Sequence, residues 1–244
     1  YHSIRFENIG KIGHLFFPFI VIVIPFLLVV IQPDLGTSLS IFLLGVMIMF
    51  FSGVRVWKFI LGIIITLISF PFLWNYIKPY QQKRIFSFLN PESDPLGQGY
   101  QLLQSKIALG SGGLIGKGFL KGTQSYLEYL PEKQTDFIFT LIGEESGFLG
   151  TIFILSLYSL LILICFYSSI KSYHIFGRII SLGIATNLFL YVLLNMFMVT
   201  GLMPVVGIPL PLLSYGGSAM LSIMISFGLL LNIDVNYSIK KINI

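Results

Sequence analysis

Long stretches without a charged side chain constrain this fold more than any other feature of the sequence. No Asp, Glu, Lys or Arg occurs among the 55 residues from Ile179 to Ile233, and other charge-free runs cover 12–33, 59–77 and 146–170. An α-helix rises about 1.5 Å per residue, so about 20 apolar residues cross the hydrocarbon layer of a bilayer. The chain is therefore predicted to be an integral membrane protein built from α-helices.

The composition agrees with this class. Only 10% of the 244 residues are charged and 55% are hydrophobic, with a mean hydropathy of +0.89, whereas a typical soluble domain is about 25% charged. The single cysteine, Cys165, lies inside an apolar run, so neither a disulfide framework nor a metal–thiolate site is expected. The chain begins with Tyr1 rather than Met and shows no cleavable signal peptide, so we expect it to be a piece of a longer protein.

The predicted fold class is an all-α polytopic membrane protein of one membrane domain. It has about six transmembrane helices and a long extracytoplasmic loop that contains an amphipathic helix. The loop covers 78–136, and such a length is uncommon unless the loop is functional. The predicted spans are about 14–31, 35–52, 59–77, 148–170, 179–200 and 211–232.

The distribution of basic residues predicts the orientation. Basic residues in short loops lie on the cytoplasmic side of a membrane, and here they occur at alternate ends of the predicted spans. This places 78–136 on the extracytoplasmic side and the C-terminus in the cytoplasm. The residues concerned are Arg5, Lys11, Arg55, Lys58, Lys171, Arg178, Lys240 and Lys241.

Two features of the predicted loop suggest surface structure. Residues 98–109 fit an amphipathic helix lying on the membrane, with Leu102, Leu103, Ile107 and Leu109 on its apolar face. The following run, GSGGLIGKG at 110–118, lacks the spacing of a nucleotide phosphate-binding loop. It is either a plain glycine-rich turn or a backbone nest in which exposed N–H groups and Lys117 bind a diphosphate.

Five of the ten acidic residues fall between Tyr126 and Gly150, and we take this stretch as the candidate active site. They are Glu128, Glu132, Asp136, Glu144 and Glu145. A carboxylate inside a bilayer costs on the order of 3 kcal/mol, so such residues are usually functional or paired. Other assignments stay open: Asp136 is also placed to cap the helix that follows it, and Glu144 and Glu145 face a cavity or mark a half-helix broken at Gly143 and Gly147.

Other polar residues of the spans have structural interpretations. Asp34, in a Pro–Asp–Leu–Gly turn, is predicted to cap the next helix with its side chain. Asn187 and Asn195, eight positions apart, are predicted to bond neighbouring helices rather than to act in catalysis.

Four long motifs resemble the SEDS family of cell-wall polymerases, in the order that the family shows. The residues of the last motif resemble those of the elongation (RodA) branch more than those of the division (FtsW) branch. The motifs are QPDLGTS at 32–38, RIFSFLNPESDPLGQGYQLLQSKIALGSGGLIGKG at 84–118, LEYLPEKQTDFIFTLIGEESGFLG at 127–150 and GLMPVVGIPLPLLSYGGSAM at 201–220.

This resemblance implies a protein of ten spans, of which about four are absent at the front of this chain. It also implies a function, the polymerisation of lipid II into glycan strands for cell elongation and rod shape. Asp136 matches the family's catalytic aspartate, and Glu128 an acidic position that supports activity. Lys83, Arg84 and Lys117 are predicted to bind the substrate diphosphate, with a divalent cation, Mg²⁺ or Mn²⁺, as a further source of positive charge. Such an enzyme resides in the bacterial cytoplasmic (inner) membrane.

Two other functions remain open at this point. A lipid II flippase needs a polar path through the spans, and a membrane scaffold for a class B penicillin-binding protein needs only a surface. Partnership with that transpeptidase, and with other membrane proteins of the elongation complex, is also compatible with polymerase activity. No nucleic-acid partner is predicted.

Overall fold

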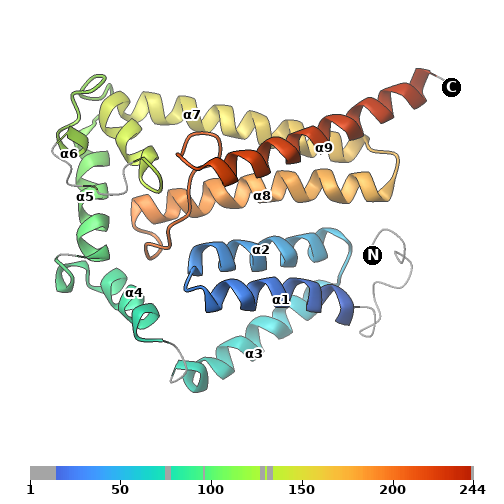
Figure 1. Ribbon diagram of the computed structural model, residues 1–244, viewed down its shortest axis with the longest axis horizontal. Helices are drawn as coiled ribbons and strands as arrows, with labels where there is room; N and C mark the ends of the chain where they lie inside the picture. The colour runs from blue at the N-terminus through green and yellow to red at the C-terminus, as the bar shows by residue number, and fades with distance from the viewer. Residues whose placement is uncertain (1–14, 75–77, 96, 127–129, 131–133, 243–244) are drawn as a thin grey trace.

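The computed structural model describes residues 15–74, 78–95, 97–126, 130 and 134–242, and these form helices, turns and coil without any strand (Figure 1). The prediction of an all-α polytopic membrane protein is confirmed. The helices are α1 (Phe16–Ile31), α2 (Leu35–Phe51), α3 (Val56–Trp74), α4 (Pro79–Leu89), the 3-10 helix η3 (Pro91–Ser93), α5 (Gln98–Ser111), α6 (Thr123–Tyr126), α7 (Ile138–Lys171), α8 (Ile175–Thr200) and α9 (Gly217–Ile242).

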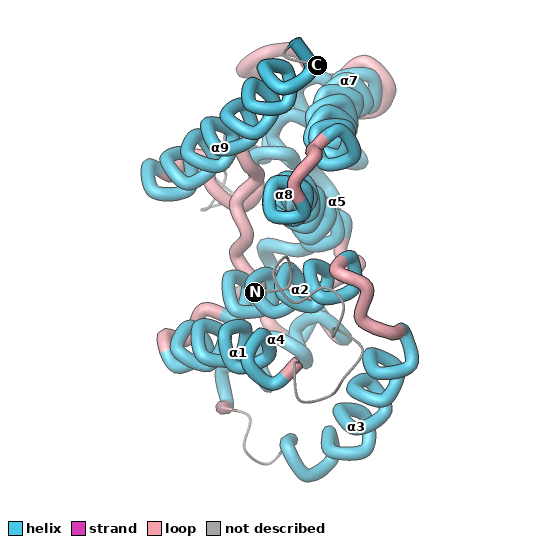
Figure 2. The backbone as a smooth tube through the Cα atoms, turned by 90° about the vertical axis from the view of Figure 1, so that its right-hand side faces the viewer, coloured by secondary structure: helices cyan, strands magenta, loops and turns pink. Residues whose placement is uncertain are grey.

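The apolar helices form two groups that meet at α8. Helices α7 and α8 and residues 217–235 of α9 are long and apolar enough to cross a membrane, while α1, α2 and 56–72 of α3 are shorter apolar helices. Figure 2 shows α7, α8 and α9 above α1, α2 and α3, and α8 packs against both α7 and α2. Half of the residues in the apolar part of α8 are buried, which makes α8 the central helix.

The connections alternate between the two ends of the bundle. The turn after α1, the segment from α4 to α6 and the turn after α8 lie at one end, and the turns that follow α2 and α7 lie at the other (Figure 1). The largest hydrophobic core lies at the first end, where α5, α7 and α8 meet the turn after α8. Its fully buried side chains include Leu102, Phe137, Met198 and Leu210.

Helix α7 is interrupted at Gly147, one of the two glycines at which the sequence allowed a broken half-helix, whereas Gly143 is helical. Gly147 has φ 68° and ψ −162°, a conformation that glycine alone adopts readily. It separates a half-helix, 138–146, from the long apolar segment 148–171. The last helix differs from the prediction: α9 begins at Gly217 rather than at 211, because 211–216 form a turn in which Leu212 has a φ of 68°.

Helix α5 confirms the predicted helix after residue 98 but buries a different face. Its buried residues are Gly99, Leu102, Ser105 and Ala108, whereas Ile107 is 50% exposed. Ser105 can be buried because its hydroxyl donates to the Val199 carbonyl at 2.8 Å and hydrogen-bonds the Thr140 hydroxyl at 2.8 Å. In Figure 1, α5 crosses the ends of α7 and α8, and it contacts both.

Candidate active site

Asp136 lies in the turn that leads into α7, between one buried neighbour and one partly buried neighbour. The N-cap position of α7 is Phe137, one residue after Asp136, and Phe137 is completely buried in the main core. Asp136 itself is partly exposed.

Asn195 of α8 holds the backbone of this turn. Its amide nitrogen Nδ2 donates to the carbonyl of Asp136 at 2.9 Å and to the carbonyl of Ile208 at 2.6 Å. The Asn195 side chain is completely buried, where a lost hydrogen bond is costly. Asn195 was predicted to bond a neighbouring helix, but its two bonds run to carbonyls of two turns, and they fix the position of Asp136 relative to the turn after α8.

That turn, residues 201–216, is fastened to the Asp136 segment by further bonds. The Ser214 hydroxyl donates to the Thr135 carbonyl at 2.6 Å and accepts from the Leu210 N–H at 2.7 Å. The N–H of Tyr215 donates to the Gln134 carbonyl at 2.9 Å. Tyr158 of α7 donates its hydroxyl to the Pro211 carbonyl. The two loop segments therefore form one unit.

Two glycines allow close approach at this unit. Gly207 has a φ of 72°, and a Cβ placed there would lie 3.2 Å from Oδ2 of Asp136. A Cβ at Gly36, in the first turn of α2, would lie 2.3 Å from the Val206 carbonyl oxygen. The turn 201–216 therefore contacts two other motif segments: it meets 134–137 beside the carboxylate of Asp136, and it meets the start of α2 at Val206.

Asp34 confirms its predicted structural role at the edge of this unit. It is the N-cap of α2, and its Oδ1 accepts a hydrogen bond from the Thr37 N–H at 3.0 Å. An N-cap aspartate satisfies an N–H group that the helix leaves unpaired.

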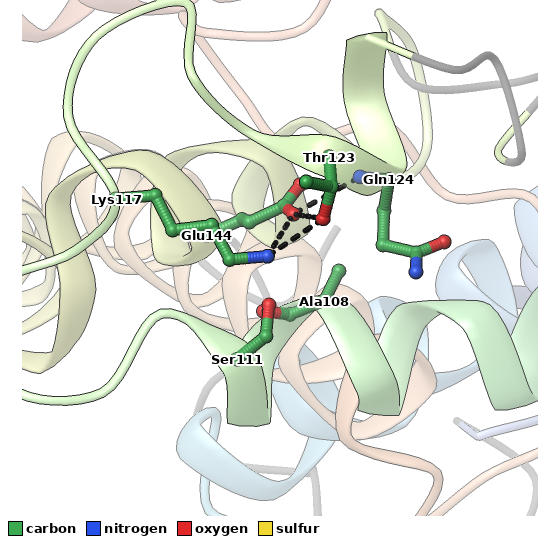
Figure 3. A network of polar contacts seen from close by, with 6 residues as sticks. All are labelled: Ala108, Ser111, Lys117, Thr123, Gln124 and Glu144. Carbon is green, nitrogen blue, oxygen red and sulfur yellow. Dashed lines mark hydrogen bonds and ion pairs between the residues drawn. The ribbon is translucent and has the colours of Figure 1, made fainter.

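Glu144, eight positions after Asp136 in the chain, forms the second polar cluster (Figure 3). Its side chain is completely buried, and Oε1 accepts from Lys117 Nζ at 2.8 Å, from the Thr123 hydroxyl at 3.1 Å and from the Gln124 N–H at 3.0 Å. Lys117 also donates to the Thr123 hydroxyl at 2.7 Å. The ammonium predicted to bind a diphosphate thus pairs with a carboxylate of the chain itself.

The other predicted diphosphate ligands lie on α4. Lys83, which is 67% exposed, pairs with Asp94 at 3.2 Å, and its hydrogen bond is the main reason why the pKa of Asp94 is below its usual value. Arg84 is partly exposed, and one of its terminal nitrogens is buried without a hydrogen-bond partner. Glu128 and Glu132 lie outside the described residues.

The described residues do not supply a cage for the predicted divalent cation. No group of three or more His, Cys, Asp or Glu side chains with metal-binding spacing occurs among them. Mg²⁺ is commonly held by one or two carboxylates together with substrate phosphates, and Asp136 could be only one such ligand. A cation therefore stays a prediction, and no step proposed below depends on it.

A cavity of about 110 Å³ lies between α8, α9 and the turn that joins them. Its walls include Asn187, Tyr191, Ser214 and Ser222, but not Asp136. Sequence reasoning did not single out Ser214, Gly207 or Tyr158. The density of Pro and Gly in 201–216 was the one local signal that this turn has a defined structure.

The fold and this arrangement define a multi-pass membrane protein with a carboxylate fixed where two loop segments meet at one end of the bundle. Residues 7–239 match the FtsW/RodA/SpoVE family of cell cycle proteins, and the chain belongs to this family. The predicted membership, with its RodA-like character, is confirmed.

Individual relatives are similar over most of this chain. The peptidoglycan glycosyltransferase MrdB of Escherichia coli K12 is 48% identical over 219 residues, covering 89% of this chain and 59% of MrdB. The stage V sporulation protein E of Bacillus subtilis is 40% identical over 229 residues, covering 93% of this chain and 62% of that protein. The chain thus spans about three fifths of the length of these relatives.

Solved structures share the fold. A peptidoglycan synthase complex that coordinates polymerization and crosslinking contains a chain with a TM-score of 0.79 and 30% identity, covering 97% of this chain and 66% of that one. A mutant of the rod shape determining protein RodA from Thermus thermophilus has a TM-score of 0.62 at 24% identity, covering 94% of this chain and 60% of that one. The latter likeness supports the fold alone.

Proposed function

We propose that the protein is a peptidoglycan glycosyltransferase that polymerises lipid II for cell elongation, with Asp136 as general base. The observation that carries this proposal is the meeting of two motif segments at the Asp136 carboxylate, which lies next to Gly207 while Asn195 holds the Asp136 backbone. The names of relatives such as the glycosyltransferase MrdB support the reaction class. A carboxylate at a rigid loop junction is suited to accept a proton from a bound hydroxyl.

In the proposed reaction, the 4-hydroxyl of an N-acetylglucosamine unit attacks the anomeric carbon of a second glycan that carries an undecaprenyl diphosphate. Asp136 takes the hydroxyl proton as the new carbon–oxygen bond forms and the bond to the diphosphate oxygen breaks. A single base and inversion at the anomeric carbon convert the α-linked donor into a β-1,4 bond. A positioned base contributes about 10²- to 10⁴-fold in rate.

The leaving diphosphate requires positive charge. Arg84 is the strongest of the predicted ligands because a buried terminal nitrogen has no partner within the described protein. Lys83 is exposed and only weakly held by Asp94. Lys117 is a poorer candidate because it already pairs with the buried Glu144.

We further propose that the Asp136 end of the bundle is extracytoplasmic and that the C-terminus is cytoplasmic, in the bacterial inner membrane. Arg55, Lys58, Lys171 and Arg178 lie at or near the two turns of the opposite end, as the positive-inside rule requires of cytoplasmic loops. A class B penicillin-binding protein is the proposed partner, supported by the likeness to a chain of a synthase complex that couples polymerization with crosslinking.

The test is polymerisation of purified lipid II by the full-length protein together with its transpeptidase partner. Asp136→Asn keeps the size of the side chain but cannot accept the proton. We expect it to reach normal membrane levels, to bind the partner and to make no glycan. Glu92→Gln, a matched carboxylate-to-amide change on the exposed η3 helix, should polymerise normally. Robust glycan synthesis by Asp136→Asn would contradict the base assignment and leave the flippase and scaffold alternatives.

A further inference from the structure

The tip of the glycine-rich loop, residues 113–120, presents large apolar side chains to its surroundings. Leu114 is 70% exposed, Ile115 81%, Phe119 81% and Leu120 71%. Four such side chains within eight residues make an apolar patch of the kind that marks an interaction surface. No mechanistic step assigned to Asp136 uses them.

The loop tip is held firmly to the break in α7. The N–H of Lys117 donates to the Glu144 carbonyl at 3.0 Å, and that of Gly118 to the Glu145 carbonyl at 2.9 Å. In return, Phe148 and Leu149 donate their N–H groups to the carbonyls of Gly113 at 2.9 Å and Leu114 at 3.1 Å. The loop thereby satisfies backbone groups that the break at Gly147 leaves without helical partners.

Close packing at two glycines reinforces this attachment. A Cβ at Gly116 would lie 2.1 Å from the Glu145 carbonyl oxygen, and a Cβ at Gly147 would lie 2.3 Å from the Gly116 nitrogen. The pair between Lys117 and Glu144 adds a side-chain link. The exposed apolar side chains therefore sit on a rigid support rather than on a free loop.

The patch is continuous with an exposed apolar surface of α7. Phe148 and Leu149, which bond the loop, are 56% and 63% exposed, and Ile152 and Phe153 on the next turn are 46% and 63% exposed. The 24 residues from 148 to 171 span about 36 Å. Because the hydrocarbon layer is about 30 Å thick, an α7 that crosses it with Lys171 at the opposite boundary would place Phe148 within a few ångströms of this one.

We propose that the loop tip 113–120 inserts into the bilayer at the extracytoplasmic boundary and contacts lipid acyl chains. Leu114, Ile115, Phe119 and Leu120 enter the apolar layer, and the exposed Lys121 stays level with the headgroup phosphates. This is the arrangement of an interfacial anchor. Through Lys117 and Glu144, the anchor fixes the height of the half-helix 138–146, and with it Asp136, relative to the membrane surface.

The test uses tryptophan fluorescence in nanodiscs that contain lipids brominated near the glycerol end of the acyl chains. The full-length protein is prepared without other tryptophans, with Trp57 and Trp74 replaced by phenylalanine. Single tryptophans are then introduced as Ile115→Trp and Phe119→Trp. The references are Phe153→Trp on the exposed face of α7 and Ser93→Trp on the exposed η3 helix.

We expect brominated lipid to quench the two loop tryptophans by as large a fraction as Phe153→Trp, and Ser93→Trp hardly at all. Quenching of both loop tryptophans at the level of Ser93→Trp would overturn the proposal. If their emission then shifted to the blue only when the transpeptidase partner was added, the patch would be a protein-binding surface instead. The readout does not depend on glycan synthesis, so failure of the proposed function would leave it unaffected.

Discussion

At the scale of single residues, Asp136 owes its position to side chains that are distant in the sequence. Asn195 is 59 positions away, and it joins the carbonyl of Asp136 to that of Ile208. Ser214, 79 positions from Thr135, anchors the residue before Asp136. A general base must be held at a defined distance from the proton it accepts, and these bonds provide that restraint.

Replacing Asn195 tests this restraint. Asn195→Leu keeps the number of side-chain heavy atoms and the branching at Cγ but leaves two carbonyls without their donor, each worth about 1–3 kcal/mol when buried. We expect a lower free energy of unfolding and a lower kcat for glycan synthesis. The control is Asn187→Leu, on the same helix but lining the cavity beside α9. Equal effects of the two substitutions would show that Asn195 has no special role at Asp136.

The pair between Lys117 and Glu144 should be structural rather than a substrate ligand. Lys117→Met leaves the completely buried Glu144 without its cation, and such a loss costs about 3 kcal/mol. Thermal unfolding can be followed through Cys165, which is 1% exposed and becomes reactive to a thiol dye when the protein unfolds.

The control for that substitution is Lys121→Met, because Lys121 is exposed and close in the chain. It should change stability by less than about 0.5 kcal/mol. The double variant Lys117→Met with Glu144→Gln should regain most of the stability, since no unpaired charge stays buried. If Lys117→Met alone left stability unchanged and weakened only lipid II use, the diphosphate role predicted from the sequence would be supported instead.

At the scale of elements, the break in α7 separates the half-helix that carries Glu144 from the long apolar segment. Gly147 at the break is in contact with the backbone of Gly116 and Ile115. Non-helical backbone near the membrane is tolerated where neighbouring protein satisfies its polar groups, and here the loop tip does so. The break and the loop are therefore one structural feature.

Gly147→Ala should disrupt this feature. Its φ of 68° and ψ of −162° cost a residue with a Cβ about 1–3 kcal/mol, and the clash 2.3 Å from the Gly116 nitrogen adds to that cost. We expect a marked loss of folded protein, measured by gel filtration and thermal unfolding. Gly62→Ala on α3, where a Cβ meets nothing within 4 Å, should be neutral or slightly stabilising. Full stability of Gly147→Ala would mean that α7 can straighten without cost.

At the scale of the whole molecule, the two ends of the bundle differ in chemistry. One end carries α4, α5, the loop tip and Asp136, and the other carries the short basic turns. The main core lies at the first end, where side chains from α5, α7, α8 and the turn 201–216 are buried together. The candidate site therefore borders the main hydrophobic core, to which the neighbouring Phe137 belongs.

Cysteine labelling in intact cells tests the orientation. Ser93→Cys on the exposed η3 helix should react with a membrane-impermeant thiol reagent, and Tyr173→Cys should not. Tyr173 is 75% exposed, whereas the neighbouring Ser172 is 5% exposed and would report burial rather than sidedness. Both cysteines should react once the cells are permeabilised. Labelling of Tyr173→Cys alone in intact cells would reverse the orientation and the side of the site.

The sequence by itself determined the features that depend on local pattern. Charge-free runs predicted the apolar helices because a bilayer admits few other structures, and the turn around Asp34 predicted its N-cap. The glycines at 143 and 147 allowed a broken half-helix, and the break falls at Gly147, where glycine tolerates the conformation. The motif residues pointed to Asp136 and to the family.

Only the tertiary structure decided which side chains meet. The Glu144 carboxylate accepts a hydrogen bond from Lys117, 27 positions away in the sequence. The Ser105 hydroxyl donates to the backbone carbonyl of Val199, 94 positions away. The sequence assigned Lys117 to a diphosphate because a basic residue in a glycine-rich loop suits an anion. In the folded chain it pairs with the buried Glu144 carboxylate, a partner that no local pattern indicated. Hydropathy and spacing record how each segment interacts with lipid and water, whereas pairing between segments depends on how the helices pack, and no local pattern contains that information.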